Sequence, residues 1–581
     1  MNWSRPLLVA LLSAVAAVGQ SPVAATGGAQ LLTPEGLVAM VRMGEPQLSP
    51  DGSYLLYTVR RIALAENRGR AEIVLLPLSD PTAARVVGTG TEPHWFAGGE
   101  KFAFVAADGL HLQSLDGAVD ERVDLGVPIA NLAVSRDGGK VSFTHTVQVE
   151  PTLVQRHPDL PLASARVYDD LMVRHWDHWR DGSYSHLFTA SLEDKMLIDL
   201  LAGAAIDTPL VPFGGSEQIC WSPDGTALCY TAKKVADPER STDSGLYVCA
   251  ANGMGRHVCI TEGMPGFDQD PAWSPDGTKI AFCSMARAGF EADRVRLMVH
   301  DVRTGKNEEL LPDFDASVHE LTFTSDSSRL YFTVETLGTT QLFTAALDAK
   351  KPIAVTTGRH ALSSIQVRHD GQKVYALRTA MELPAAIVEI DVATGAIRVV
   401  ADANQETLAQ LALPTVEGEW FEATDGKKIH AWIVKPKDFD PTKKYPFVLF
   451  CQGGPQSMVG QAFSYRWNFH LMAAKGYVVA GVNRRGLPGF GQAWNDQISR
   501  DWGGQAMRDL LSVTDAMQAR SYIDKARSAA VGASFGGFSV YWLMGNAGDR
   551  FACMIGHCGV FNLDSMLLST EEQWFTNWDL G

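Results

Sequence analysis

The sequence predicts a β-propeller of about seven blades, followed by an α/β-hydrolase domain that is incomplete at its C-terminal end. Three observations predict this class. A turn motif recurs along residues 35–400, apolar strands alternate with helical stretches after residue 405, and one serine is set among small residues at positions 531–537. We expect the propeller to span residues 31–404 and the hydrolase domain to span residues 405–581.

The recurrent turn has the form Ser-Pro-Asp-Gly, in which Pro and Asp initiate the turn and Gly takes the left-handed position. Each copy is followed by a short alternating strand, such as residues 279–282. The copies recur at intervals of roughly 40–50 residues, as propeller blades built from short strands do. A solenoid is less favoured, because no helical period separates the strands. The copies begin at Ser49, Phe96, Ser135, Ser222, Ser274, Thr324 and Arg368.

The interval between Ser135 and Ser222 is about twice the others, so we expect one blade to carry an insertion. Residues 168–179 of this insertion are dense in aromatic, acidic and histidine side chains. One interpretation is a substrate-binding wall, in which a carboxylate holds an ammonium group and tryptophans line its cage. The other is a loop packed between blades. The candidate binding residues are Asp169, Asp170, Trp176 and Asp177.

The chain of 581 residues carries a formal net charge of −16 and has a pI of about 5.4. This acidic balance argues against nucleic acid or an anionic membrane as a partner, because both are polyanions. Solubility alone also explains such a balance. A homodimer is compatible with the sequence.

Residues 1–25 have the pattern of a signal peptide. Arg5 supplies a positive start, and residues 7–18 form an apolar run that is too short to span a bilayer. We therefore expect the protein to be periplasmic or secreted.

Eight cysteines are compatible with such an oxidising compartment. Cys220 and Cys229 lie symmetrically about one turn, and Cys249 and Cys259 lie symmetrically about another. Each pair either forms a disulfide across a hairpin or remains as two thiols within the strands.

After residue 405 the pattern changes to continuous apolar strands. Residues 445–451, 477–482, 529–532 and 551–555 are such strands, and residues 505–519 have the apolar spacing of an amphipathic helix. This alternation predicts a parallel sheet that is covered by helices on both faces.

Ser534 stands in the pattern G-x-S-x-G, between a strand-like and a helix-like run. This nucleophile elbow exposes a serine hydroxyl on a sharp turn, and glycines flank the serine because side chains there would collide with the backbone. A second glycine-rich loop begins at Gln452 and Gly453, directly after a predicted strand. We expect a backbone N–H of this loop and the N–H of Phe535 to form an oxyanion hole.

In the fold that carries this elbow, the acid and the histidine of the catalytic triad follow the serine in chain order. We expect both to lie beyond Gly581, which would leave the chain as given inactive by itself. His557 and Asp564 do follow Ser534, but His557 ends the next predicted strand and Asp564 opens the loop after it. We interpret both as structural residues.

Four motifs follow one another in this domain. They are Q-G-G-P at 452–455, N-R-R-G-x-x-G-F-G at 483–491, D-W-G-G-Q at 501–505 and G-A-S-F-G-G-F-S at 532–539. With them, the chain resembles the prolyl oligopeptidase family of serine peptidases from about residue 31 to residue 581. Gln452 stands where several members carry a tyrosine whose hydroxyl assists the oxyanion, so the backbone amides must carry more of that role here.

The resemblance implies Ser534 as the nucleophile, an acyl-enzyme intermediate, and neither a metal nor an organic cofactor. It also implies an exopeptidase that releases dipeptides from the amino end of short peptides, and the signal-peptide pattern adds that this enzyme is exported. Val560, Leu563 and Met566 are expected to line the specificity pocket, and their aliphatic character predicts alanine or another apolar residue before the scissile bond. Two alternatives remain open: an acylaminoacyl peptidase or esterase on the same fold, and an inactive peptide-binding fragment.

Overall fold

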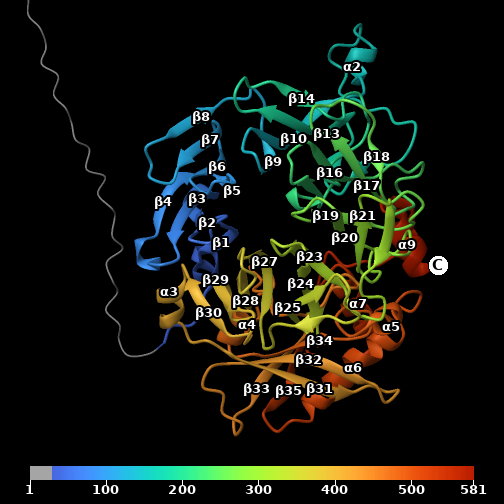
Figure 1. Ribbon diagram of the computed structural model, residues 1–581. Helices are drawn as coiled ribbons and strands as arrows, with labels where there is room; N and C mark the ends of the chain where they lie inside the picture. Colours follow the sequence, from blue (N-terminus) through green and yellow to red (C-terminus); the bar gives the residue numbers. More distant parts are fainter. Residues whose placement is uncertain (1–28) are drawn as a thin grey trace, which may run out of the picture.

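The computed structural model describes residues 29–581, so the predicted signal peptide at residues 1–25 lies outside the described residues. A ring of small antiparallel sheets occupies the upper part of Figure 1, and one larger sheet with its helices lies below it. Within residues 29–581, no helix combines the length and apolar character that crossing a bilayer requires.

Within the described chain the ring consists of seven four-stranded blades, which confirms the predicted propeller. A single parallel pair, Thr340 with Ala361, joins the sixth blade to the seventh. The first three blades are β1 (Arg42–Leu48), β2 (Tyr54–Ala63), β3 (Arg68–Pro77) and β4 (Arg85–Thr89); β5 (Thr91–Trp95), β6 (Lys101–Ala106), β7 (Gly109–Ser114) and β8 (Asp120–Val123); and β9 (Ala130–Val134), β10 (Lys140–Gln148), β13 (Ser183–Ser191) and β14 (Leu197–Asp199).

The remaining four blades follow in chain order. They are β15 (Ile219–Trp221), β16 (Ala227–Ala232), β17 (Gly245–Ala250) and β18 (Val258–Cys259); β19 (Asp268–Trp273), β20 (Lys279–Ser284), β21 (Arg296–Asp301) and β22 (Lys306–Glu309); β23 (Val318–Phe323), β24 (Arg329–Thr336), β25 (Thr339–Ala346) and β26 (Ile353–Ala354); and β27 (Ala361–Val367), β28 (Lys373–Ala380), β29 (Leu383–Asp391) and β30 (Ile397–Ala401). The insertion lies inside the third blade, between β10 and β13, and contains α2 (Leu153–Arg156), β11 (Arg174–His175) and β12 (His178–Trp179).

The recurrent turn joins the first strand of a blade to the second. In the fifth blade, the Ser274 hydroxyl donates to Asp276 Oδ1 at 2.7 Å and accepts from the N–H of Lys279 at 2.9 Å. The same carboxylate accepts the N–H of Thr278 at 3.0 Å. Serine and aspartate therefore recur together because each supplies hydrogen bonds that hold the turn.

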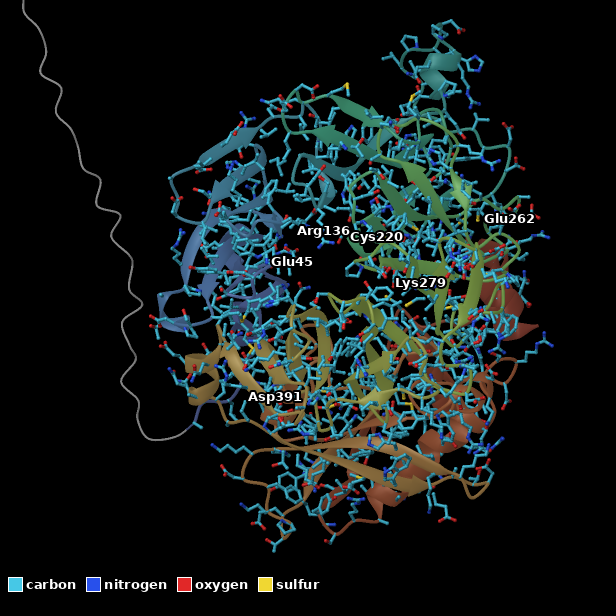
Figure 2. All side chains as sticks on the ribbon, viewed as in Figure 1. Glu45, Arg136, Cys220, Glu262, Lys279 and Asp391 are labelled. Carbon is cyan, nitrogen blue, oxygen red and sulfur yellow. The ribbon has the colours of Figure 1, made fainter. Side chains whose placement is uncertain are left out.

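A second repeat, not expected from the sequence, lies on the innermost strands. Six of them carry a non-glycine residue with a φ between 51° and 55°, each at a β-bulge. Glu45 accepts the N–H of Glu92 at 2.9 Å, and Glu92 accepts the N–H of Leu132 at 2.6 Å, so these carboxylates link successive blades. Figure 2 shows Glu45 on the inner side of the ring and Glu262 at its outer side. The six residues are Glu45, Glu92, Asn131, Asp270, Glu320 and Ser364.

The larger sheet has the strand order β31-β32-β34-β33-β35-β36. Its first two strands are antiparallel to their neighbours, and the other four run parallel to one another. The strands are β31 (Thr415–Glu422), β32 (Lys428–Lys435), β33 (Tyr445–Cys451), β34 (Val478–Asn483), β35 (Ile523–Ala533) and β36 (Cys553–His557). This sheet confirms the α/β-hydrolase architecture predicted for the second part of the chain.

Helices pack on the sheet and bury the largest apolar cluster of the described chain, which includes Leu449, Leu510 and Phe535. A short helix near the amino end packs in a separate apolar cluster, in which Leu37 lies with Phe463 of the hydrolase domain. The helices are α1 (Pro34–Ala39), α3 (Gln405–Gln410), α4 (Phe469–Ala474), α5 (Gln492–Asp496), α6 (Gln505–Gln518), α7 (Phe535–Asn546), α8 (Leu563–Ser569) and α9 (Gln573–Leu580).

All eight cysteines are free thiols. Cys220 does lie directly opposite Cys229, on β15 and β16. The predicted opposition of Cys249 and Cys259 is wrong, because the register of β17 and β18 places Tyr247 opposite Cys259. The connection between these strands is therefore not symmetric about the turn that the sequence indicated.

Candidate active site

Ser534 stands between the end of β35 and the start of α7 with φ 56° and ψ −120°. A non-glycine residue rarely holds such a conformation, and where it does the surrounding structure enforces it. Two backbone hydrogen bonds hold this turn: the Ser534 N–H donates to the carbonyl of His557 at 3.0 Å, and the N–H of Phe538 donates to the Ser534 carbonyl at 3.0 Å. The chain thus makes the sharp strand-to-helix turn of a nucleophile elbow.

The glycines around Ser534 are required by close approach of backbone to backbone. A Cβ at Gly532 would lie 2.7 Å from the carbonyl oxygen of Cys451, at the end of β33. A Cβ at Gly536 would lie 2.1 Å from the same oxygen. A Cβ at Gly537 would meet Gly559 Cα at 2.5 Å. Only glycine at these positions lets the turn sit against the neighbouring strand.

The predicted oxyanion loop begins directly after β33 and lies beside Ser534. A Cβ at Gly453 would be 3.7 Å from Ser534 Cβ. Phe535 is the first residue of α7, where an amide has no acceptor within the helix. Within residues 29–581, no hydrogen bond uses the N–H of Gly453 or of Phe535. The Gln452 side chain turns to Ser457 Oγ, at 3.1 Å.

His557 and Asp564, which we interpreted from the sequence as structural residues, do not contact the Ser534 hydroxyl. The ring of His557 packs against Trp467 with 6.1 Å between centroids, and Asp564 lies in the first turn of α8. Within residues 29–581, no histidine ring is hydrogen-bonded to Ser534 Oγ. The described residues also contain no cluster of three or more histidine, cysteine or carboxylate side chains placed to hold a metal ion.

A cavity of about 690 Å³ lies between the propeller and the hydrolase domain. Gly454 and Gln456 of the oxyanion loop line it, as do Glu572 and Trp574, which flank the start of α9. The propeller contributes further carboxylates, including Glu291. The carboxylates that line the cavity are Asp207, Glu217, Asp270, Glu291 and Glu572.

Two of these carboxylates are neighbours that come from different domains. Glu572 Oε1 accepts hydrogen bonds from His175 Nε2 at 3.1 Å and from Trp176 Nε1 at 2.9 Å. Glu291 Oε2 accepts one from Trp574 Nε1 at 3.0 Å. Burial, together with the negative charge of Glu572, raises the pKa of Glu291 to about 7.

Arg180 and Lys233 also line the cavity, and Arg180 pairs with Asp207 at 3.5 Å. The five carboxylates outnumber these two basic side chains, so the excess of negative charge favours a bound cation.

The structure distributes the predicted substrate-binding residues over three places. Asp169 and Asp170 line a separate cavity of about 530 Å³ within the insertion. Asp177 is 86% exposed beside His178. Trp176 packs edge-on against Phe213, with 4.9 Å between ring centroids. Of the insertion, Met172, His175 and Arg180 line the larger cavity.

The three aliphatic residues predicted for the specificity pocket all pack against the same apolar cluster. Val560, Leu563 and Met566 are partly buried and pack against the main core of the hydrolase domain. No binding role was predicted from the sequence for Glu291, Glu572 or Trp574. The adjacent carboxylates Glu571 and Glu572 were the available signal.

Replacing Gly536 by alanine tests the close approach at the elbow. We expect Gly536→Ala to lower the free energy of unfolding by about 3 kcal/mol, because the new Cβ would overlap the Cys451 carbonyl oxygen. Gly545→Ala is the matched control in the same helix, since a Cβ there meets no atom within 4 Å. Urea unfolding of both variants measures the difference. Equal stabilities would contradict the steric account.

The chain matches the family model described as "Prolyl oligopeptidase family" over residues 463–581. It is 38% identical over 582 residues to dipeptidyl-peptidase 5 of Porphyromonas gingivalis, covering 98% of this chain and 84% of that one. It is 29% identical to dipeptidyl-peptidase 5 of Aspergillus fumigatus, covering 95% and 82%.

Solved structures share the fold. An acylaminoacyl peptidase in complex with Z-Gly-Gly-Phe-chloromethyl ketone superposes with a TM-score of 0.79 at 18% identity, covering 95% of this chain and 83% of that one. A Pyrococcus horikoshii acylaminoacyl peptidase gives a TM-score of 0.78 at 17% identity, with the same coverages. The family match and the 38% identity over 98% of the chain confirm the resemblance that the motifs indicated: the chain belongs to the prolyl oligopeptidase family.

Proposed function

We propose that this protein is an exported serine peptidase that releases dipeptides from the free amino end of short peptides. The observation that carries the proposal is the meeting of Ser534, the Gly453 loop and the first amide of α7 at one edge of the sheet, beside a cavity lined by carboxylates. The names of the two similar dipeptidyl peptidases support the same reading.

The proposed reaction begins with Ser534 Oγ, which attacks the scissile carbonyl carbon while a histidine removes its proton. The resulting oxyanion accepts the N–H groups of Gly453 and Phe535. Collapse of this intermediate breaks the C–N bond, and the histidine returns the proton to the leaving amine. Water then hydrolyses the acyl-enzyme by the same steps. In this fold the histidine follows the serine and the acid in chain order, a place that His557 does not take.

The carboxylates of the larger cavity suit the ammonium group of a peptide's amino end. Glu291 and Glu572 are both partly removed from water, and the positive charge of an ammonium group would offset the cost of holding two carboxylates there. We assign the amino-end contact to these two side chains rather than to the insertion's aspartates, which lie elsewhere.

For the residue before the scissile bond we retain the proposal that Val560, Leu563 and Met566 favour alanine or another apolar side chain. Their aliphatic surfaces offer no partner for a charged group, so burying a charge among them would be costly.

Hydrolysis of fluorogenic Ala-Ala and N-acetyl-Ala-Ala amides by the product of the complete gene tests the reaction. We expect the free dipeptide to be released from the first substrate, and Ser534→Ala to lower kcat by about 10³-fold or more. Ser521→Ala, at an exposed position, is the matched control and should be as active as the unchanged protein. Preferred cleavage of the acetylated substrate would favour an acylaminoacyl peptidase instead.

The amino-end assignment predicts that Glu291→Gln and Glu572→Gln each lower kcat/KM about tenfold or more for Ala-Ala amide and leave residual cleavage of the acetylated amide unchanged. Glu422→Gln, at an exposed position on β31, is the control.

The ratio of the two kcat/KM values should also depend on pH. It should fall below about pH 7, where Glu291 takes up a proton, and above about pH 8, where the substrate's amino group loses one. A ratio that is independent of pH, or equal losses for both substrates, would contradict the assignment.

A further inference from the structure

Arg484 is a fully buried side chain directly behind the oxyanion loop. It follows β34 in the N-R-R-G motif and is 0% exposed. Its Nη2 donates to the carbonyl oxygens of Pro455 at 3.1 Å and Gln452 at 3.3 Å, and its Nη1 donates to the Arg485 carbonyl at 2.7 Å. On its other side, the guanidinium carbon lies 4.5 Å from the centroid of the Phe535 ring.

The energetic setting of Arg484 is unusual. Within residues 29–581 no carboxylate forms an ion pair with it, and burial lowers its pKa. The neighbouring Arg485, by contrast, pairs with Asp509 and Asp425. A buried guanidinium without a counter-ion is costly. Two of its three hydrogen bonds go to the oxyanion loop, the third goes to the Arg485 carbonyl, and its face lies over the ring of Phe535. A contribution to the free energy of folding therefore does not explain a buried charge at this position.

We propose that Arg484 is a positioning residue that sets both donors of the oxyanion hole. This inference rests on the proposed role of Ser534. One donor, the N–H of Gly453, belongs to the same peptide unit as the Gln452 carbonyl that Arg484 binds. The other donor, the N–H of Phe535, belongs to the residue whose ring covers the guanidinium. The Arg484 side chain thus contacts both the peptide unit that contains the Gly453 N–H and the residue that contains the Phe535 N–H.

Because the Gln452 carbonyl and the Gly453 N–H belong to one rigid peptide unit, the hydrogen bond from Arg484 to this carbonyl also orients the N–H. A trans peptide unit is planar, and its C=O and N–H point in opposite directions. When Arg484 holds the Gln452 carbonyl, the N–H of Gly453 must point away from the guanidinium. Gly453 itself lies beside Ser534, since a Cβ on it would be 3.7 Å from Ser534 Cβ. The bond to Pro455 holds the far end of the same loop. Oxyanion donors act through such prior orientation, because they need not reorganise when charge develops.

The positive charge of Arg484 also strengthens the oxyanion hole. A cation at a carbonyl oxygen polarises the peptide unit and strengthens its N–H as a donor. The buried positive charge also favours negative charge developing nearby, because little water screens it. Lysine keeps the charge but lacks the planar fork that binds two carbonyls at once.

Arg484→Met, Arg484→Lys and the control Arg508→Met test this role in the product of the complete gene. Arg508 lies exposed on α6 and bonds only to the Gln505 side chain. We expect Arg484→Met to lower kcat about 100-fold while KM for Ala-Ala amide changes less than about threefold. The inhibition constant of a dipeptide boronic acid, which forms a tetrahedral adduct on serine, should rise by the same factor as kcat falls. The affinity of the product dipeptide should stay unchanged. For Arg484→Lys, both kcat and the inhibition constant should lie between those of the unchanged protein and those of Arg484→Met.

A folded Arg484→Met variant with unchanged kcat and boronic acid affinity would overturn the inference, as would a loss of kcat without a loss of boronic acid affinity. Should the methionine variant fail to fold, the lysine variant decides by the same two measurements. An unchanged protein that cleaves neither amide would overturn the proposed function itself, and the inference with it.

Discussion

The close approach of the Ser534 turn to the end of β33 is the constraint on which the site depends. The carbonyl oxygen of Cys451 lies where a Cβ of Gly532 or Gly536 would be, so the turn can sit there only without side chains. Because β33 and β35 are parallel neighbours, the loop that leaves β33 emerges beside the serine that ends β35. The oxyanion loop and the elbow are thus brought together by strand order, and Arg484 from the next strand lies behind both.

The propeller and the hydrolase domain meet around the larger cavity, and the insertion of the third blade reinforces that meeting. Arg174 pairs with Glu571 at 3.3 Å, and the N–H of Trp176 donates to Glu571 at 2.6 Å. Glu572 is held in turn by His175. The insertion therefore fixes the position of a hydrolase loop, and its own aspartates remain outside the cavity. Both domains therefore contribute residues to the lining of the cavity.

Much of this could be predicted from sequence because the signals are local. The Ser-Asp turns carry their hydrogen bonds within a few residues, and the elbow glycines are adjacent to the serine that requires them. The cavity could not be predicted, because Glu291 and Glu572 become neighbours only when the ring closes on the sheet. The bulges were missed because Glu45 and Glu92 are atypical of positive φ, and Arg484 because charged residues are ordinarily exposed. The Cys249–Cys259 pairing failed because hairpin register depends on the connection.

Labelling with a fluorophosphonate tests whether Ser534 is an activated nucleophile, because the reagent bonds to a serine only where a base and an oxyanion hole activate it. The product of the complete gene would be labelled, digested with trypsin and analysed by mass spectrometry. We expect one modified peptide, residues 528–550, with the adduct on Ser534 and on neither Ser528 nor Ser539. An adduct on another serine, or none in a folded protein, would contradict the claim that these loops form the site.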